Sequence, residues 1–227
     1  MKHAKRRRRS RRKSQKFTLP TIHLVIICVL VIAVFSAYLY FSHFQFSYTL
    51  NNGAISLKHF TVKQEYLTPN PYSRSQKALK KVNAIVVHYT ANANTSAESN
   101  RSYFNGLATS HTTRASAHFI IDPDGTILQI IPLNEVAYAN YPRNYDTISI
   151  ECCYKDTNGK FTNATYQSLI ALVKALMSAY HLDSGDVIRH YDVTGKLCPL
   201  YYVRNPKEWT LFKQRLDGWN IFGVIYL

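Results

Sequence analysis

The sequence predicts an α/β domain, in which helices pack on a β-sheet, preceded by a single transmembrane helix. Three observations predict this arrangement. A long uncharged apolar segment lies near the N-terminus, short apolar runs typical of strands recur between residues 82 and 153, and amphipathic helical patterns stand between and after these runs. Such alternation is typical of α/β folds. At 227 residues, the chain is long enough for one domain of ordinary size with appendages.

The net charge of +15 is concentrated at the N-terminus. Ten Lys and Arg residues lie among the first 16 residues, and the first acidic residue is Glu65. From Glu65 onward, 16 basic residues and 13 acidic residues nearly balance. A domain that binds nucleic acid should carry its basic excess on the fold itself. We therefore expect no nucleic-acid partner, and we interpret residues 1–20 as a cytoplasmic basic tail.

Residues 22–41 are uncharged and almost entirely apolar. As a helix, this segment would span roughly 30 Å, which is the thickness of the hydrocarbon core of a bilayer. It is apolar on every side, whereas a helix that packs on a soluble core is usually amphipathic. Basic residues flank only its N-terminal side, so the positive-inside rule places the N-terminus in the cytoplasm and the rest of the chain outside. We predict a single-pass anchor over residues 21–41 and a location in the cell membrane.

A cleaved signal peptide is the alternative for this segment. The apolar run exceeds the roughly 7–15 residues of an ordinary signal core, and no A-x-A site follows it, which favours an uncleaved anchor. Val34-Phe-Ser36 is a weak cleavage candidate. The basic tail then sets the orientation and contacts anionic lipid head groups.

Residues 42–81 are predicted to be an extracellular stalk or linker. They carry turn signals at Asn51-Asn-Gly53 and at Pro69-Asn-Pro71. Alternating apolar residues around Phe60-Thr-Val62 are compatible with a short strand. The folded domain is predicted to cover residues 82–218, and residues 219–227 are expected to be a C-terminal tail.

The four cysteines do not fit a disulfide scaffold. Cys28 lies in the apolar segment, and Cys152, Cys153 and Cys198 follow it. An exported domain with an odd number of cysteines leaves at least one thiol for other chemistry.

Val82–Thr90 is a short apolar run with polar flanks, which predicts a buried strand. His88 lies near its C-terminal end, where ligands and catalytic groups collect in α/β sheets. A single histidine in a core strand is more often a packing residue. A functional role for His88 therefore depends on partners elsewhere in the chain.

Three segments have helical patterns. Thr95-Ser-Ala-Glu98 can form a capping box and predicts a helix that Gly106 ends. Residues 163–181 carry apolar side chains at helical spacing and predict an amphipathic helix that packs on the sheet. Asn205-Pro206 fits the cap and first position of a last helix, which should end near Gly218.

Ala115–Ile131 predicts a β-hairpin, because two apolar runs flank the turn sequence Asp122-Pro-Asp-Gly125. His118 lies in the first strand of this hairpin. A structural or substrate-lining role is favoured for it over a role as a metal ligand.

Thr147–Cys153 is a further predicted strand with one charged residue, Glu151. With a period of two, Ile148, Ile150 and Cys152 face one way, and Ser149, Glu151 and Cys153 face the other. An unpaired carboxylate in an apolar strand is costly. Glu151 is thus either an ion-pair partner of a basic neighbour or a carboxylate held near a metal-bound water. For Cys153, packing is favoured over contact with a metal or a redox role.

The segment Ile188–Pro199 places a histidine, a lysine and a cysteine close together, with Gly195 as a bend between them. Imidazole and thiolate are ligands that zinc prefers, and three protein ligands with an open fourth position are typical of catalytic zinc. His88 can supply the third ligand. The sequence therefore suggests a metal site of His88, His190 and Cys198.

The stretches AIVVHYTAN, ASAHFIIDPDGTILQIIPLNEVAYA, ISIECCY and IRHYDVTGKLCP follow one another with a characteristic order and spacing. In these stretches, and in their order and spacing, the chain from residue 83 to 216 resembles the type 2 N-acetylmuramoyl-L-alanine amidases. Peptidoglycan-recognition proteins and some phage lysins share the fold of this family. The resemblance implies a central, mostly mixed β-sheet flanked by helices.

The resemblance also implies the chemistry of the site. It implies a Zn²⁺ cofactor bound by His88, His190 and Cys198. Glu151 is then expected to act as the general base and Lys196 to stabilise the oxyanion. Zinc lowers the pKa of its water to roughly 7, which would supply a nucleophile at neutral pH.

The family cleaves the amide between N-acetylmuramic acid and the L-alanine of the stem peptide. The expected partner is therefore peptidoglycan, with the domain on the cell-wall side of the membrane. Tyr89, Thr90 and His118 are expected to line the substrate groove. The alternative is a non-catalytic, membrane-anchored peptidoglycan-binding module of the same fold. Such relatives typically lack the cysteine ligand, so the presence of Cys198 favours the enzyme.

Overall fold

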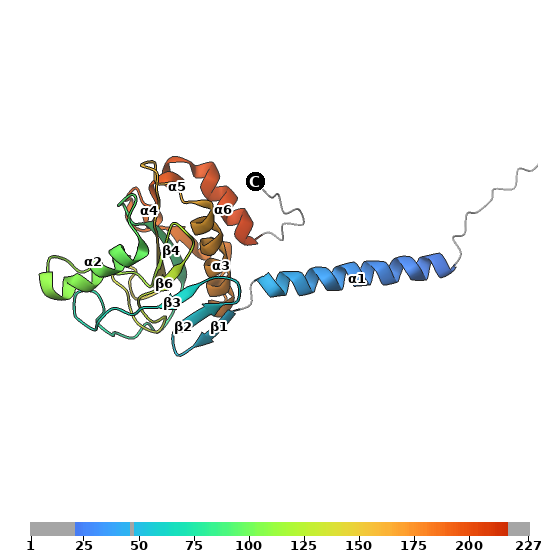
Figure 1. Cartoon of the computed structure of the whole chain (residues 1–227), viewed down its shortest axis with the longest axis horizontal. Helices are drawn as coiled ribbons and strands as arrows, with labels where there is room; N and C mark the ends of the chain where they lie inside the picture. The colour runs from blue at the N-terminus through green and yellow to red at the C-terminus, as the bar shows by residue number, and fades with distance from the viewer. Residues whose placement is uncertain (1–20, 46–47, 218–227) are drawn as a thin grey trace, which may run out of the picture. The chain divides into compact units, whose positions relative to one another are not determined.

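The computed structural model describes residues 21–45 and 48–217 (Figure 1). The chain divides into two compact units, Met1–His43 and Phe44–Leu227. Each unit is described by itself below.

The described part of the first unit lies in helix α1, Thr21–Gln45, which extends two residues beyond the end of that unit. Its side chains are described over residues 23–38, and its large apolar side chains there are exposed. Among the described residues, no helix is both long and apolar enough to cross a membrane. The predicted anchor, residues 21–41, extends beyond the described side chains. The predicted tails, 1–20 and 219–227, lie outside the described residues.

The second unit is built on a six-stranded sheet with the strand order β3-β6-β5-β7-β4-β8. The strands are β3 (Val62–Gln64), β4 (Ala84–Tyr89), β5 (Phe119–Ile121), β6 (Ile127–Gln129), β7 (Thr147–Cys152) and β8 (Val187–Arg189). β5, β7, β4 and β8 run parallel to one another, whereas β6 is antiparallel to β5 and parallel to β3. The sheet is therefore mixed, as predicted.

Helices cover both faces of this sheet (Figure 1). They are α2 (Ala97–Ser110), α3 (Asn163–Tyr180), α4 (His190–Thr194), α5 (Leu200–Arg204) and α6 (Pro206–Asp217), with a short 3₁₀ turn at Ser184–Asp186. α3 packs on one face and contacts α6, while α2 contacts β5 and β6 from the other face. This arrangement confirms the predicted α/β class.

The alternation predicted for β7 is confirmed. Ile148, Ile150 and Cys152 are fully buried in the core beneath α3. Cys153 joins the smaller core beneath α2, so it has a packing environment. Each large aliphatic side chain buried in this way contributes about 1.5–3 kcal/mol. Glu151 is the charged exception, and it lies on the α2 side of the sheet.

The predicted stalk is wrong for residues 48–81, which fold onto the domain. They form the antiparallel pair β1 (Tyr48–Asn51) and β2 (Ala54–Leu57), and then β3 at the edge of the main sheet. Ile55 and Leu67 are fully buried. The start of the domain at residue 82 is therefore corrected to Tyr48, because apolar side chains between the turn signals pack into the core.

A buried glutamine holds the β1–β2 hairpin to the sheet. The side chain of Gln129, in β6, accepts a hydrogen bond from the Ile55 backbone at 3.0 Å and donates to the Gly53 carbonyl at 2.6 Å. A buried polar group is retained where its hydrogen bonds are made. Ile55 and Gly53 lie about 75 positions before Gln129 in the chain. Because the partners are so far apart, the sequence pattern does not reveal this contact.

The predicted limits of α2 are also corrected. Ser96, rather than Thr95, is the N-cap, and its side chain accepts from the Ser99 backbone at 3.1 Å. The helix continues through Gly106 to Ser110. A helical glycine costs about 1 kcal/mol relative to alanine, and burial of Leu107 in the next position offsets that cost.

The other predicted elements are present. The hairpin of β5 and β6 turns at Gly125, where φ is +91°, and Asp122 donates its backbone N–H to Thr126 at 2.8 Å. α3 and α6 lie where their patterns predicted them. Strand β8 and the short helices α4 and α5 were not predicted.

Candidate metal and catalytic site

The three predicted metal ligands meet at one edge of the sheet. His88 is the second-last residue of β4, and His190 directly follows β8 as the first residue of α4. β4 and β8 are adjacent parallel strands, so their carboxyl ends lie together. Cys198 returns to this edge in the loop after α4, where its carbonyl accepts a hydrogen bond from the Tyr191 backbone at 2.9 Å.

Gly195 turns the chain back toward the edge, as the sequence predicts. Its φ of +77° is in the left-handed region, which glycine adopts at little cost. Its N–H donates to the Tyr191 carbonyl at 2.8 Å and ends α4 after little more than one turn. Cys198 therefore returns to the side of the two histidines.

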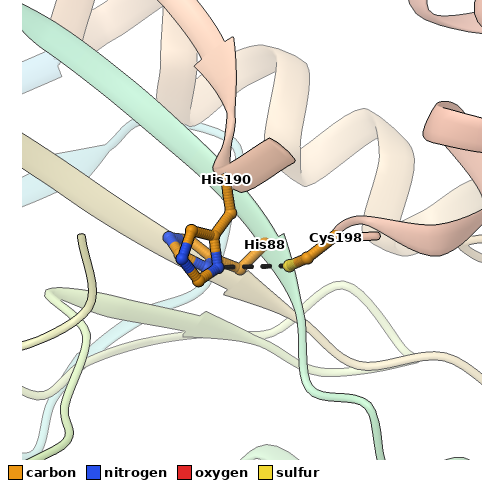
Figure 2. Close-up of side chains that lie close together, drawn as sticks. All are labelled: His88, His190 and Cys198. Carbon is orange, nitrogen blue, oxygen red and sulfur yellow. Dashed lines mark hydrogen bonds between the residues drawn. The ribbon is translucent and has the colours of Figure 1, made fainter. Parts of the chain in front are cut away.

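The donor atoms of His88, His190 and Cys198 are close enough to share one ion (Figure 2). All three lie within 4.8 Å of one another. The Sγ of Cys198 is 3.7 Å from Nδ1 of His88, and tetrahedral zinc with ordinary bond lengths would separate nitrogen from sulfur by about 3.6 Å. Two imidazoles and one thiol therefore fit a metal ion, and this donor set is one that zinc prefers.

Unpaired buried atoms gather at the same edge. Within the described part of the chain, four buried side-chain polar atoms lack a hydrogen-bond partner: Ser75 Oγ, Thr90 Oγ1, Glu151 Oε2 and His190 Nδ1. The last three belong to residues at or just beyond the carboxyl ends of β4, β7 and β8. Buried polar groups are nearly always paired, so such a concentration is a feature typical of a functional site.

Glu151 lies beside the metal ligands because β4 and β7 are in parallel register. His88 and Glu151 are direct partners across these strands, and Oε1 of Glu151 is 3.8 Å from Nδ1 of His88. Burial raises the pKa of Glu151 to about 8, and Lys196 opposes this rise. Among the described residues, no Lys or Arg forms an ion pair with it. Glu151 therefore lies beside a candidate metal ligand, and its role at a metal-bound water stays a prediction.

Burial favours the uncharged forms of the three ligands. It lowers the pKa of His88 to about 3 and also lowers the pKa of His190. It raises the pKa of the Cys198 thiol to about 12. Both imidazoles are therefore neutral and carry a lone pair for a metal, and a bound cation would favour the thiolate of Cys198.

Lys196 is exposed. Its charge lowers the pKa values of Glu151, His190 and Cys198, in each case after the larger effect of burial. Stabilisation of an oxyanion by Lys196 stays a prediction.

A comparison with protein families matches residues 78–200, more than half of the chain, to the family described as N-acetylmuramoyl-L-alanine amidase. The chain belongs to this family. The predicted resemblance is thereby confirmed, and the match covers the strands and loops that carry all of the candidate residues.

Individual relatives agree with this assignment. The N-acetylmuramoyl-L-alanine amidase CwlL of Bacillus licheniformis is 34% identical over 170 residues, which cover 69% of this chain and 47% of CwlL. The chain thus spans about half the length of the curated relatives it matches. A mutant endolysin from Bacillus subtilis superposes with a TM-score of 0.58 and 29% identity, over 69% of this chain and 99% of the endolysin chain.

A second solved structure is the catalytic domain of XlyA, an amidase of Bacillus subtilis (strain 168). It has a TM-score of 0.57 and 28% identity, and the match covers 69% of this chain and 99% of that domain. The folded unit of this amidase-family chain is therefore similar to a complete catalytic domain.

The structure does not place His118 where a substrate could touch it, so that prediction is corrected. The side chain is fully buried. Its Nδ1 accepts from the Ser149 backbone at 3.1 Å, and its Nε2 lies 3.0 Å from the Glu135 carbonyl. Both ring nitrogens are used, and burial lowers the pKa of His118 to about 4. His118 is a neutral structural histidine.

The other two predicted substrate-lining residues differ from each other. The ring of Tyr89 packs on the α3 side, with its centroid 5.4 Å from that of Tyr154, so it lies on the opposite face from His88. Thr90 donates its backbone N–H to the Cys152 carbonyl, and its buried hydroxyl is one of the unpaired atoms described above. A substrate contact for Thr90 stays a prediction.

One site residue had no sequence signal. Asn140 lies in the loop between β6 and β7, and its Oδ1 is 2.6 Å from Nε2 of His88. Both side chains are almost completely buried. A lone asparagine in a loop is usually a turn residue, and it was not selected from the sequence for that reason.

Proposed function

We propose that this chain is a zinc-dependent N-acetylmuramoyl-L-alanine amidase acting on peptidoglycan. The bond cleaved would be the amide between N-acetylmuramic acid and the L-alanine of the stem peptide. The observation that carries the proposal is the position of Glu151, whose Oε1 lies 3.8 Å from a nitrogen of a candidate metal ligand. Family membership and similarity to a solved amidase catalytic domain support it.

His88, His190 and Cys198 would hold the ion. When bound there, zinc supplies a Lewis acid and an activated water for attack on the amide. The three residues would supply three protein ligands, which is the number typical of catalytic zinc sites.

Glu151 is suited to move the proton of the attacking water. Its Oε2 is buried and has no partner among the described residues. Burial raises the pKa of Glu151, but Lys196 opposes this rise and a bound cation would oppose it further, and the ionised carboxylate can then accept a proton. The same oxygen can then deliver the proton to the leaving nitrogen of L-alanine. General acid–base catalysis of this kind contributes about 10²- to 10⁴-fold to a rate.

Lys196 is suited to stabilise the negative charge that develops on the carbonyl oxygen. Its ammonium group is exposed, and its charge acts on the carboxyl of Glu151 and on the ligands. A fixed cation near a developing oxyanion stabilises the transition state more than the ground state.

The test is digestion of purified peptidoglycan by the zinc-loaded full chain. We expect new free amino groups on L-alanine. Glu151→Gln keeps the size of the side chain and removes the base, so turnover should fall at least about 100-fold while zinc content stays unchanged. Glu98→Gln, at an exposed position in α2, is the matched control and should keep full activity.

Two outcomes would overturn the proposal. Retention of the zinc-loaded chain on peptidoglycan with no release of L-alanine termini would favour the non-catalytic binding module. Full activity and full zinc content in Cys198→Ser would contradict the ligand assignment.

We also propose that residues 21–41 anchor the protein in the cell membrane, with residues 1–20 in the cytoplasm and the domain on the cell-wall side. Leu24, Val25, Ile26 and Ile27 are each 49–60% exposed, and four successive helical positions cover every side of α1. The basic residues before them favour this orientation. Without detergent, the full chain should sediment with membranes after a carbonate wash, and protease added to spheroplasts should degrade the domain. A full chain that stays in the supernatant would refute the anchor, and a purified chain lacking the segment would indicate cleavage.

A further inference from the structure

We propose that Asn140 is a positioning residue that fixes which nitrogen of His88 faces the metal site. The inference concerns a residue to which neither the family match nor the proposed mechanism gives a role. Asn140 Oδ1 and His88 Nε2 are 2.6 Å apart, and each residue is only 2% exposed. No water can compete for a contact this deeply buried, so the chemistry of the two groups must match.

The direction of the Asn140 amide is set by Thr147, the first residue of β7. The Thr147 hydroxyl donates its single hydrogen to the Arg143 carbonyl at 2.7 Å. It can therefore only accept from Asn140, 2.8 Å away, and an acceptor requires the amide NH₂ opposite it. With Nδ2 directed at Thr147, the amide oxygen is directed at His88. The assignment follows from the network of donors and acceptors, which is the proper basis for orienting an amide.

The amide oxygen then fixes the tautomer of His88. An oxygen can only accept, so Nε2 of His88 must carry the hydrogen, and a neutral imidazole has only one. Nδ1 is left with its lone pair. This nitrogen lies 3.7 Å from Cys198 Sγ and 3.8 Å from Glu151 Oε1, so the lone pair is at the candidate metal site.

Asn140 is itself held in place by its loop. The side-chain oxygen of Asn144 accepts from the backbone N–H groups of Asn140 at 2.6 Å and of Ala139 at 3.1 Å. Together with the bond to Thr147, these contacts fix both the backbone and the side chain of Asn140. A metal-ligating histidine commonly donates its second nitrogen to a fixed oxygen of this kind, and loss of that oxygen typically costs about 10- to 100-fold in metal affinity.

A neutral amide also suits this place better than a carboxylate would. Glu151 is already a buried acid near His88, and a second buried carboxylate would add an uncompensated charge in the metal-free protein. An amide supplies the acceptor without that charge. Asn140→Asp should therefore keep the orientation of His88, whereas Asn140→Leu should lose it.

The decisive measurement is the tautomer of His88 in the metal-free full chain, labelled with ¹⁵N only at its nine histidines. The His88 signals are identified by their loss in His88→Gln. We expect the Nε2–H tautomer alone in the wild type, a mixture of tautomers in Asn140→Leu, and recovery of Nε2–H in Asn140→Asp. Zinc affinity, measured by chelator competition, should fall about 10- to 100-fold in Asn140→Leu and recover in Asn140→Asp.

Thr147→Val supplies an independent test if Asn140→Leu fails to fold. It keeps Asn140 but removes the group that directs its amide, so part of the Nε2–H population should be lost. An Nδ1–H tautomer in the wild type, or an unchanged tautomer and unchanged zinc affinity in both Asn140→Leu and Thr147→Val, would overturn the inference. The tautomer measurement uses neither zinc nor peptidoglycan. It therefore stands even if the proposed amidase activity fails.

Discussion

Acidification should destabilise the domain through His118, and the variant His118→Gln should remove that part of the pH dependence. In the folded protein, burial lowers the pKa of His118 to about 4, whereas an unfolded chain titrates near 6.5. Between these values, the unfolded state binds more protons than the folded state. Stability from His118 is therefore fully present above pH 6.5, is lost as the pH falls through this window, and stops falling below about pH 4.

The size of the effect follows from the two pKa values. At pH 7.5, His118 is neutral in both states and contributes almost no pH dependence. At pH 5, it is protonated in nearly all unfolded molecules but in few folded ones, which corresponds to a loss of about 2 kcal/mol. The variant starts from a lower stability by about 1–3 kcal/mol, because the Ser149 backbone N–H loses its acceptor. That cost does not depend on pH.

The assay is urea unfolding of the metal-free full chain in detergent at both pH values, followed by the fluorescence of buried Trp209. The wild type should lose about 2 kcal/mol more than His118→Gln between pH 7.5 and pH 5. Protonation of His88, whose pKa burial also lowers, occurs in both proteins and cancels in the difference. Equal pH dependence of the two proteins would refute the assignment of His118 as a buried neutral histidine.

Three further predictions, one of them with a matched control substitution, test the fold. Ile55→Ala should lower the free energy of unfolding in urea by about 2–5 kcal/mol, because Ile55 is fully buried. Leu50→Ala, at a 43% exposed position of the same hairpin, is the control and should change this free energy little. Equal effects of the two substitutions would argue for a loose stalk. Gly195→Ala should lower the free energy of unfolding by only about 1–2 kcal/mol, which is the cost of a left-handed backbone for alanine. No atom lies within 4 Å of an added Cβ, so a larger loss would mean a steric clash. Arg189→Ala should weaken zinc binding, measured by chelator competition, because Arg189 pairs with Asp192 at 2.7 Å and so fixes the start of α4. Unchanged zinc affinity would show that α4 holds its position without this ion pair.

The sequence was sufficient to locate the site where chemistry and chain pattern coincide. His88 and Glu151 are near the ends of apolar runs, and such runs become adjacent parallel strands whose ends meet. His190, Gly195 and Cys198 lie in one short segment, so their proximity needs no knowledge of the rest of the fold. These residues could be predicted because local pattern and residue type are enough to place them.

Residues 48–81 show where the sequence was insufficient. Turn signals and short apolar runs favoured a linker, since no single run is long enough to predict an element. Ile55 and Leu67 become core residues only through contacts with distant strands. Gln129 decides the docking of the hairpin, and its partners are far away in the sequence. Contacts of this kind carry no periodic signal.

His88 and His118 show how small the physical difference between a candidate ligand and a structural histidine can be. Both are buried, both are neutral, and both lie on the α2 side of the sheet. In each, Nε2 lies within hydrogen-bond distance of a fixed oxygen, from Asn140 or from the Glu135 backbone. The difference is at Nδ1. In His118 it accepts the Ser149 backbone N–H, whereas in His88 it faces the sulfur of Cys198. A single backbone donor thus separates the two roles, and its position depends on strand register rather than on the residues next to either histidine.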